Sequence, residues 1–203
     1  EAVLQAFGNG EFDILLGTQM VSKGHDFKNV FSVGILTADS ILNIPNYTAS
    51  ERTFDLLTQT AGRAGRDDGE GKVIIQTYNP SHYAIIYSKT HDYISFYKEE
   101  IKFRESLNYP PFESMVHIVF RHKNKKTMYD NANKAVSDLL KFSDGLADKA
   151  EIFGPYEDSI GKIRDYFRVS IMVKGKNLSS LKEYIYNSWI FTCEGTFIDV
   201  DPI

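Results

Sequence analysis

The segment from Phe31 to Thr77 decides the fold class of the first part of the chain. It contains the apolar run FSVGILTA at 31–38, the helical pattern SERTFDLLTQTAGRA at 50–64 and the apolar run VIIQT at 73–77. Short apolar runs that alternate with helices are typical of parallel strands joined by crossover helices. A further run, FDILL at 12–16, precedes them, so we predict an α/β lobe with a parallel sheet.

The predicted helix at 50–64 has one apolar and one polar face. At about 100° per residue the apolar side chains fall on one side, and these are Phe54, Leu57, Ala61 and Ala64. The opposite side carries Arg52, Gln59, Arg63 and Arg66. We expect Ser50 to cap the start of this helix and Gly65 to end it.

Two prolines separate this lobe from a second pattern. Helices predicted at 80–86 and 93–106 lead to Asn108-Tyr109-Pro110-Pro111, where the prolines prevent the helix from continuing. Beyond them we expect strands at 115–120, 152–153, 167–173 and 197–200, and helices at 127–146 and 178–189. This β-α-β-β-α-β order predicts a ferredoxin-like α+β domain. We divide the chain into a lobe at 1–90, a helical linker at 91–111 and a C-terminal domain at 112–203.

The composition excludes several protein classes. Hydrophobic residues make up 42% of the 203 residues, and no apolar run approaches the roughly 20 residues needed to span a bilayer. The single cysteine, Cys193, allows no internal disulfide and fits a reducing compartment, so we expect a cytoplasmic protein with no membrane partner and an inert thiol. The chain begins at Glu1 without an initiator Met, and we expect it to be part of a longer protein.

The end of the helix at 50–64 carries the strongest chemical signal, Gln59-Thr60-Ala61-Gly62-Arg63-Ala64-Gly65-Arg66. Two glycines near a helix end each lower the stability of the helix by about 1 kcal/mol relative to alanine. Such a loss is typical of a position where a ligand or another backbone approaches closely and compensates for it. Arginine presents a planar, permanently charged fork that can stabilise a phosphoryl group. The alternative is a solvated basic helix end that the helix dipole favours.

A polar loop, Gly17-Thr18-Gln19-Met20-Val21-Ser22-Lys23-Gly24-His25-Asp26-Phe27, follows the run at 12–16. Ligands of open α/β sheets bind at the carboxyl ends of the strands. Thr18 and Gln19 offer hydrogen-bonding groups, and Lys23 offers a cation. Gly24 gives the backbone conformational freedom, and Asp26 is a hydrogen-bond acceptor. The alternative is a turn with only a structural role.

The net charge of 23 − 27 = −4 means that a nucleic acid would need a local cluster of cations. One cluster lies at a predicted strand-to-helix turn and contains Arg121, Lys123, Lys125 and Lys126. Another flanks Tyr166 and Phe167 and contains Lys162, Arg164 and Arg168. Basic residues interleaved with aromatic ones suit a phosphate backbone and stacked bases. The alternative is a solvated turn beside core aromatics, and we expect Tyr184, Tyr186 and Trp189 to be packing residues.

These motifs resemble motifs V and VI of superfamily 2 helicases, and more closely the primosomal protein N′ (PriA) family. The resemblance rests on residues 17–27, on Ala38-Asp39 and on residues 51–66, and it continues in Tyr109-Pro110-Pro111-Phe112, Gly154-Pro155-Tyr156, residues 162–164 and residues 166–168. It covers nearly the whole chain. It departs at Asn46-Tyr47-Thr48, where the family commonly has Asp-Phe-Arg, so we assign Thr48 no role.

The resemblance implies an ATP-dependent 3′ to 5′ DNA helicase, active in the bacterial nucleoid, that recognises stalled or branched replication forks and initiates primosome assembly for replication restart. It implies that Arg63 and Arg66 reach the ATP γ-phosphate with Gln59 beside them, that Gly24 and Asp26 line the nucleotide, and that Thr18, Gln19 and Lys23 face DNA. Its partners would be branched and single-stranded DNA, other primosome proteins and single-strand-binding proteins. The alternatives are another superfamily 2 DNA translocase and a non-catalytic DNA-structure-binding or interaction protein.

The sequence also lacks motifs that such an enzyme needs. It contains no Gly-x-x-x-x-Gly-Lys-Ser/Thr phosphate loop and no Asp-Glu-x-His segment. We therefore expect ATP and Mg²⁺ to be cofactors of the longer enzyme, and the chain by itself to be inactive. The zinc-binding cysteines of the family are absent as well, so we predict zinc in the longer protein and no metal site in this chain.

Overall fold

The computed structural model describes residues 2–18, 27, 30–62, 64 and 71–202, without the side chains of residues 158–160. The chain divides into two compact units, Glu1–Ile101 and Lys102–Ile203, and each is described by itself. We call them the first unit and the second unit.

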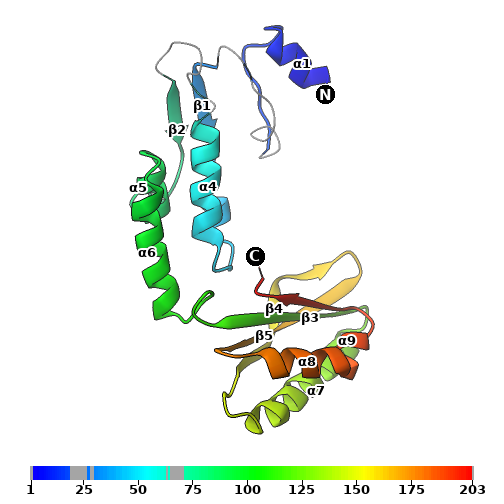
Figure 1. The fold of residues 1–203 in the computed structure, drawn as a ribbon. Helices are drawn as coiled ribbons and strands as arrows, with labels where there is room; N and C mark the ends of the chain where they lie inside the picture. Colours follow the sequence, from blue (N-terminus) through cyan, green and yellow to red (C-terminus); the bar gives the residue numbers. More distant parts are fainter. Residues whose placement is uncertain (1, 19–26, 28–29, 63, 65–70, 203) are drawn as a thin grey trace. The chain divides into compact units, whose positions relative to one another are not determined.

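The first unit is built around two short parallel strands. Strand β1 (Ser32–Ile35) pairs with β2 (Lys72–Ile75), with Val33 opposite Val73, and helix α4 (Ala49–Ala61) lies between them in the sequence. The other helices are α1 (Ala2–Gly8), α3 (Asp39–Leu42), α5 (Tyr83–Ser88) and α6 (Tyr93–Ser106), which extends into the second unit (Figure 1). The parallel pairing confirms the predicted order of strand, helix and strand.

The apolar face of α4 forms the core of the first unit, as its periodicity predicts. Leu57 is buried beside Ile35 and Ile85. The ring of Phe54 stacks on that of Phe96 with 4.4 Å between centroids. On the opposite face Gln59 is exposed, so the two-faced character predicted for this helix is confirmed at the described positions.

The prediction of a strand at 12–16 is wrong. No strand pairs with this segment among the described residues, and Phe12, Ile14 and Leu16 are 54%, 85% and 83% exposed. An apolar run becomes a strand only when a neighbouring strand accepts its backbone hydrogen bonds and its side chains find cover.

The predicted start of α4 is also wrong, because Thr48 and not Ser50 occupies the N-cap. The backbone nitrogen and the hydroxyl of Thr48 both donate to Asn46 Oδ1 at 2.8 Å, which fixes a turn ahead of the helix. Thr48 is 4% exposed and therefore has a structural role that the sequence did not assign. The helix ends at Gly62, ahead of Gly65, which lies outside the described residues.

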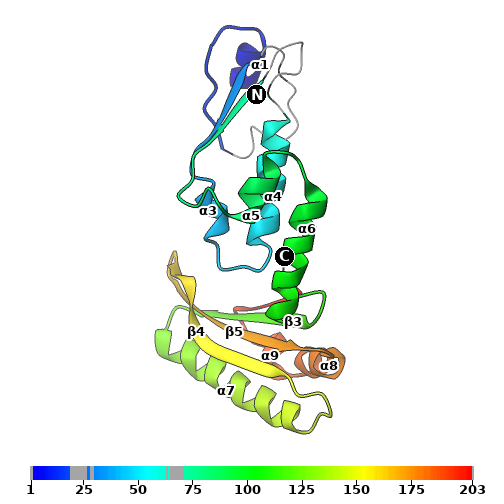
Figure 2. The same cartoon turned by 90° about the vertical axis from the view of Figure 1, so that its left-hand side faces the viewer.

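The second unit is a four-stranded antiparallel sheet with helices. Its strands are β3 (Ser114–His122), β4 (Glu151–Ile163), β5 (Tyr166–Gly175) and β6 (Thr196–Val200), in the spatial order β4-β5-β3-β6. Its helices are α7 (Lys125–Asp144), α8 (Ser179–Asn187) and the short α9 (Trp189–Thr192). All three helices lie on one face of the sheet (Figures 1 and 2).

Alternate residues of the strands pack against these helices. The inward side chains of β3 are Val116, Ile118 and Phe120, and those of β5 are Val169, Ile171 and Val173, all 2% exposed or less. Tyr184 and Trp189 pack against this core, as expected, but Tyr186 is 65% exposed. The prediction for Tyr186 is wrong because its ring lies outside the core and meets Phe191 at 4.7 Å.

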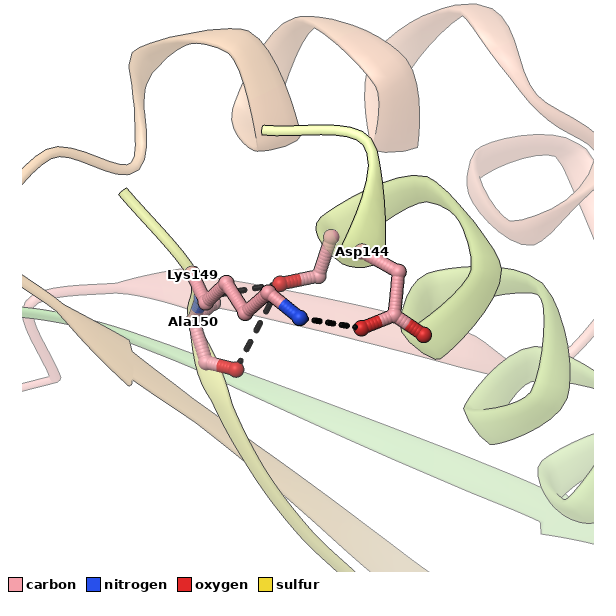
Figure 3. Close-up of polar contacts among 4 residues, drawn as sticks. Asp144, Lys149 and Ala150 are labelled. Carbon is pink, nitrogen blue, oxygen red and sulfur yellow. Dashed lines mark hydrogen bonds and ion pairs between the residues drawn. The ribbon is translucent and has the colours of Figure 1, made fainter. Parts of the chain in front are cut away.

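The connection from α7 to β4 is closed by local polar contacts. The buried hydroxyl of Ser143 accepts a hydrogen bond from the backbone nitrogen of Ala150 at 2.8 Å. Next to it, Lys149 Nζ lies 2.9 Å from Asp144 Oδ1 in an exposed ion pair (Figure 3). These contacts fix where β4 leaves the helix layer and enters the sheet.

Candidate nucleic-acid interface

The nucleotide and DNA residues predicted in the first unit are only partly described. Gln19, Lys23, Gly24, Asp26, Arg63 and Arg66 lie outside the described residues. Thr18 and Gln59 are described, and both are exposed. The roles assigned to this group therefore stay predictions.

Asp39 ties the carboxyl ends of the two parallel strands together. Its carboxylate accepts hydrogen bonds from the backbone nitrogen of Tyr78 and the hydroxyl of Thr77, both at 3.0 Å. Desolvation alone raises the pKa of Asp39, but the hydrogen bonds from Tyr78 and Thr77 outweigh it and leave the pKa below its ordinary value. Asp39 thus remains ionised and holds the two strand ends in register.

In the second unit, the sheet has a face that α7, α8 and α9 do not cover, which we call the open face. On β3 it carries Val119 and Arg121, because Ile118 and Phe120 point to the helices. The pairing register places Arg121 opposite Arg168 of β5 and Val119 opposite Phe197 of β6. Residues from three strands thus meet on this face.

One end of the open face combines cations with aromatic rings. The guanidinium carbon of Arg121 lies 4.2 Å from the ring centroid of Phe197 and 5.5 Å from that of Tyr166. Lys123 Nζ lies 5.6 Å from the same Tyr166 ring. Two residues predicted as DNA contacts, Arg121 and Lys123, are therefore brought together around one tyrosine, and we call Arg121, Lys123, Tyr166 and Phe197 the aromatic-basic cluster.

A second group of predicted contacts gathers at the neighbouring strand edge. Lys125, Lys162 and Arg168 line a small hollow together with Glu157. Lys125 Nζ lies 3.0 Å from Glu157 Oε1, and the hydroxyl of Tyr129 donates to the same oxygen at 3.1 Å. The contact with Lys125 has the largest effect on the pKa of Glu157 and lowers it, and the hydrogen bond from Tyr129 lowers it further. The carboxylate therefore stays charged and offsets part of the local positive charge.

Lys126 and Arg164 lie at the ends of elements near this group. Lys126 is exposed in the first turn of α7, where its backbone nitrogen donates to Asn124 Oδ1 at 2.9 Å. Arg164 lies in the turn between β4 and β5 with a φ of 54°. The side-chain cap means that the helix start has its own intramolecular acceptor.

Tyr166 and Phe167 lie on opposite faces of the sheet, with Tyr166 on the open face beside Arg121 and Lys123. Phe167 packs against the core on the helix side of the sheet, because consecutive residues of a strand point to opposite faces. Sequence analysis also missed Phe197, which joins Tyr166 only through the pairing of β6 with β3. The apolar pair Phe197-Ile198 was the available signal for a strand, but it could not show which face Phe197 occupies or which strand lies alongside.

The other end of the open face is occupied by the chain itself. Lys174 Nζ donates to the carbonyl of Leu107 and lies 4.8 Å from the ring centroid of Tyr109. The segment that precedes β3 therefore covers the Lys174 end, whereas Tyr166 and Phe197 are 38% and 49% exposed.

Metal and membrane features were searched in the described part of the chain. Within those residues, no three side chains of His, Cys, Asp or Glu are grouped as they would be to hold a metal ion. In the same residues, no helix combines the length and the apolar character needed to cross a membrane.

Comparison with known proteins identifies the family. Residues 105–203 match the model of the primosomal protein N C-terminal domain. The replication restart protein PriA of Bacillus subtilis is 45% identical over 181 residues, which are 89% of this chain and 22% of that protein. The chain belongs to the PriA family. PriA of Borreliella burgdorferi is 37% identical over 90% of the chain, and that of Treponema pallidum is 35% identical over all of it. The chain spans 27% and 31% of the length of these two PriA proteins.

Proposed function

We propose that the chain is part of an ATP-dependent 3′ to 5′ DNA helicase that acts in replication restart. In this proposal the enzyme recognises stalled or branched forks and initiates primosome assembly in the bacterial cytoplasm, at the nucleoid. Its partners are branched and single-stranded DNA, other primosome proteins and single-strand-binding proteins. The relationship to proteins named replication restart protein PriA, which extends over both units, supports this proposal.

The fold of each unit fits a part of such an enzyme. The parallel pair β1 and β2 with α4 between them fits one edge of a RecA-like helicase lobe. Phe31, Leu36 and Ile74 are 75%, 65% and 56% exposed around this pair, as in a sheet that other segments complete. The strand order β4-β5-β3-β6 fits a ferredoxin-like domain.

In the helicase lobe, Arg63 and Arg66 would stabilise charge on the transferred phosphoryl group, with Gln59 beside them. Gly24 and Asp26 would line the nucleotide, and Thr18, Gln19 and Lys23 would contact DNA. ATP and Mg²⁺ would be held mainly by residues outside this chain, because its sequence contains no phosphate loop. Zinc would likewise be held by cysteines of the longer protein.

DNA binding by the second unit rests on one observation, the gathering of cations at one end of its sheet. These are Arg121, Lys123, Lys125, Lys126, Lys162, Arg164 and Arg168, in a chain whose net charge is −4. Neutralising phosphates with such a cluster releases counterions, so the affinity falls as salt rises.

Charge reversal tests this surface. The variant Lys125→Glu/Lys126→Glu should bind a fluorescent forked DNA about tenfold more weakly than the unmodified chain, with a shallower salt dependence, in fluorescence anisotropy titrations. The matched control is Lys141→Glu/Lys149→Glu at the other end of α7, which also reverses one ion-paired and one further exposed lysine. Equal losses in both variants would mean that net charge alone attracts DNA.

The helicase assignment is tested in the longer protein. Arg63→Ala or Arg66→Ala should abolish DNA-stimulated ATP hydrolysis and leave DNA binding largely intact, whereas residues 1–203 should hydrolyse no ATP. Unchanged turnover in either arginine variant would remove the phosphoryl-transfer role from that residue.

A further inference from the structure

We propose that the open face of the second unit binds single-stranded DNA by stacking unpaired bases on Tyr166 and Phe197, with Arg121 between the two rings. This inference rests on the proposed function and deepens it, because it specifies the form of DNA and the contacts that select it.

The pairing register places side chains from three strands, β3, β5 and β6, on the same side of the sheet. Arg121 from β3 lies opposite Arg168 from β5, and Phe197 from β6 lies opposite Val119. Arg121 is exposed, and together with Lys123 it makes this end of the open face positively charged. A phosphate backbone supplies anions along its whole length.

Exposed aromatic rings lie beside these cations. Phe197 is 49% exposed and Tyr166 is 38% exposed, and Phe153 and Tyr156 of β4 add further rings that are 49% and 41% exposed. Tyr156 lies opposite Ser170, which is fully buried, on the side of Arg168, whereas Phe153 lies opposite Met172 and closer to the Lys174 end of the open face. Apolar rings interleaved with cations match a polymer that alternates flat bases with charged phosphates.

The backbone fixes the position of Arg121. Its nitrogen donates to the carbonyl of Gly195 at 3.0 Å. Gly195 has a φ of +79°, and a Cβ atom there would lie 2.3 Å from the carbonyl oxygen of Arg121. Only glycine fits this contact, and the guanidinium is held against the two rings before any ligand binds.

Stacking on these side chains selects single strands over duplexes. In a duplex the faces of the bases are covered by their neighbours, whereas a single strand can turn its bases onto a protein surface. Four-stranded sheets whose aromatic residues stack two or three bases are a known solution to single-strand recognition. A guanidinium plane can serve as a stacking surface in the same way as a ring.

The rest of the open face limits the site to the Arg121 end. Lys174 is engaged with Leu107 and Tyr109 at the opposite end. On β6, Asp199 is exposed opposite His117, two residues beyond Phe197, and its carboxylate disfavours phosphate. The site is therefore short, and we expect it to hold two or three nucleotides.

The experiment measures the binding of two fluorescent DNA oligonucleotides to the 203-residue chain, and both oligonucleotides carry the same number of phosphates. One is a 15-nucleotide oligothymidine, and the other has abasic sites at its central positions. The unmodified chain should bind the oligothymidine about tenfold more tightly than the abasic strand and more tightly than a duplex of the same length. Tyr166→Leu and Phe197→Leu should remove that preference and leave the salt slope unchanged.

Two controls separate stacking from loss of structure. Tyr166→Phe keeps the ring and should keep the preference. Tyr186→Leu removes another exposed ring, 65% exposed on α8 in the helix layer, and should have no effect. A strand with 5-iodouracil should photocrosslink to Tyr166 or Phe197, as identified by mass spectrometry.

The outcomes distinguish this inference from the proposed function. Equal affinity for the two strands, with an effect of Lys125→Glu/Lys126→Glu but none of the ring variants, would overturn stacking and leave DNA binding by the basic residues intact. No binding of any DNA would overturn both.

Discussion

The two units of the chain differ in how completely they bury their apolar side chains. Among the described residues, the second unit has one continuous core of fourteen buried residues, whereas the first has two small clusters of four and three. Antiparallel strands joined by hairpins and backed by helices on one face close a core locally, whereas a parallel pair depends on cover from both faces. We therefore expect the second unit to unfold in a cooperative transition of its own.

The largest expected effect is the removal of a core leucine from the second unit. Leu139→Ala empties space around a fully buried side chain and should lower the free energy of unfolding by about 2–5 kcal/mol. Trp189, the one tryptophan of the sequence, packs against this core, so its fluorescence in urea reports on the second unit.

The matched variant in the first unit is Leu57→Ala, since Leu57 is 1% exposed. In this variant the urea midpoint reported by Trp189 fluorescence should stay the same. Part of the helical circular dichroism signal should be lost at a lower urea concentration than in the unmodified chain. A Trp189 midpoint that moved equally in both variants would show that the units unfold together and would end the comparison.

Glycine substitutions sharpen the contrast in packing. Gly195→Ala in the second unit meets both a left-handed φ and the Arg121 carbonyl, and it should cost about 1–3 kcal/mol in the urea experiment. Gly34→Ala in β1 meets no atom within 4 Å and should be neutral or slightly stabilising. A large loss in the Gly34 variant would contradict the open packing of the first unit.

A smaller effect is expected where the second unit closes the connection between α7 and β4. Ser143→Ala removes the acceptor of the Ala150 nitrogen from a buried site, which should cost about 1 kcal/mol. Lys149→Ala breaks only the exposed ion pair with Asp144 and should not change the midpoint measurably. If the lysine variant were the more damaging one, surface charge would contribute more to this unit than its core contacts do.

The smallest expected effect is a pH dependence confined to the first unit. Burial lowers the pKa of His82, although the nearby Glu100 raises it in part, and the neutral ring accepts a hydrogen bond from the Ala84 nitrogen at the start of α5. The unfolded chain binds a proton at its ordinary pKa before the folded chain does, so stability falls as the pH drops below about 6.5 toward the lower folded pKa.

Hydrogen exchange of the α5 peptide measures this dependence. Between pH 7 and pH 5 its protection should fall relative to that of His82→Asn, which keeps a capping side chain without a titrating ring. Peptides of α7 serve as the internal reference in the second unit. Equal changes in protection in the unmodified chain and in the Asn variant at every pH would exclude His82 as the cause.

The outcome for individual elements shows what local sequence information can decide. Helix α6 was predicted with its observed bounds, Tyr93–Ser106, because its start and the following prolines are local signals. The run at 12–16 has the same apolar character as β1 but forms no strand, because a strand requires a hydrogen-bonded neighbour that local composition does not show. The start of α4 was misplaced because the side chain of Asn46, upstream of the helix, fixes the turn.

The sequence by itself determined the order β1-α4-β2 in the first unit and β3-α7-β4-β5-α8-β6 in the second, the two faces of α4, the basic clusters and the membership of the PriA family. Only the tertiary structure decided that Phe197 joins Arg121 and Tyr166, that Phe167 turns to the core, and that Asp39 binds the residues after β2. The physical reason is that periodicity records which side of its own element a residue occupies. Which strand lies alongside, and in which register, depends on backbone hydrogen bonds between segments that are distant in the sequence.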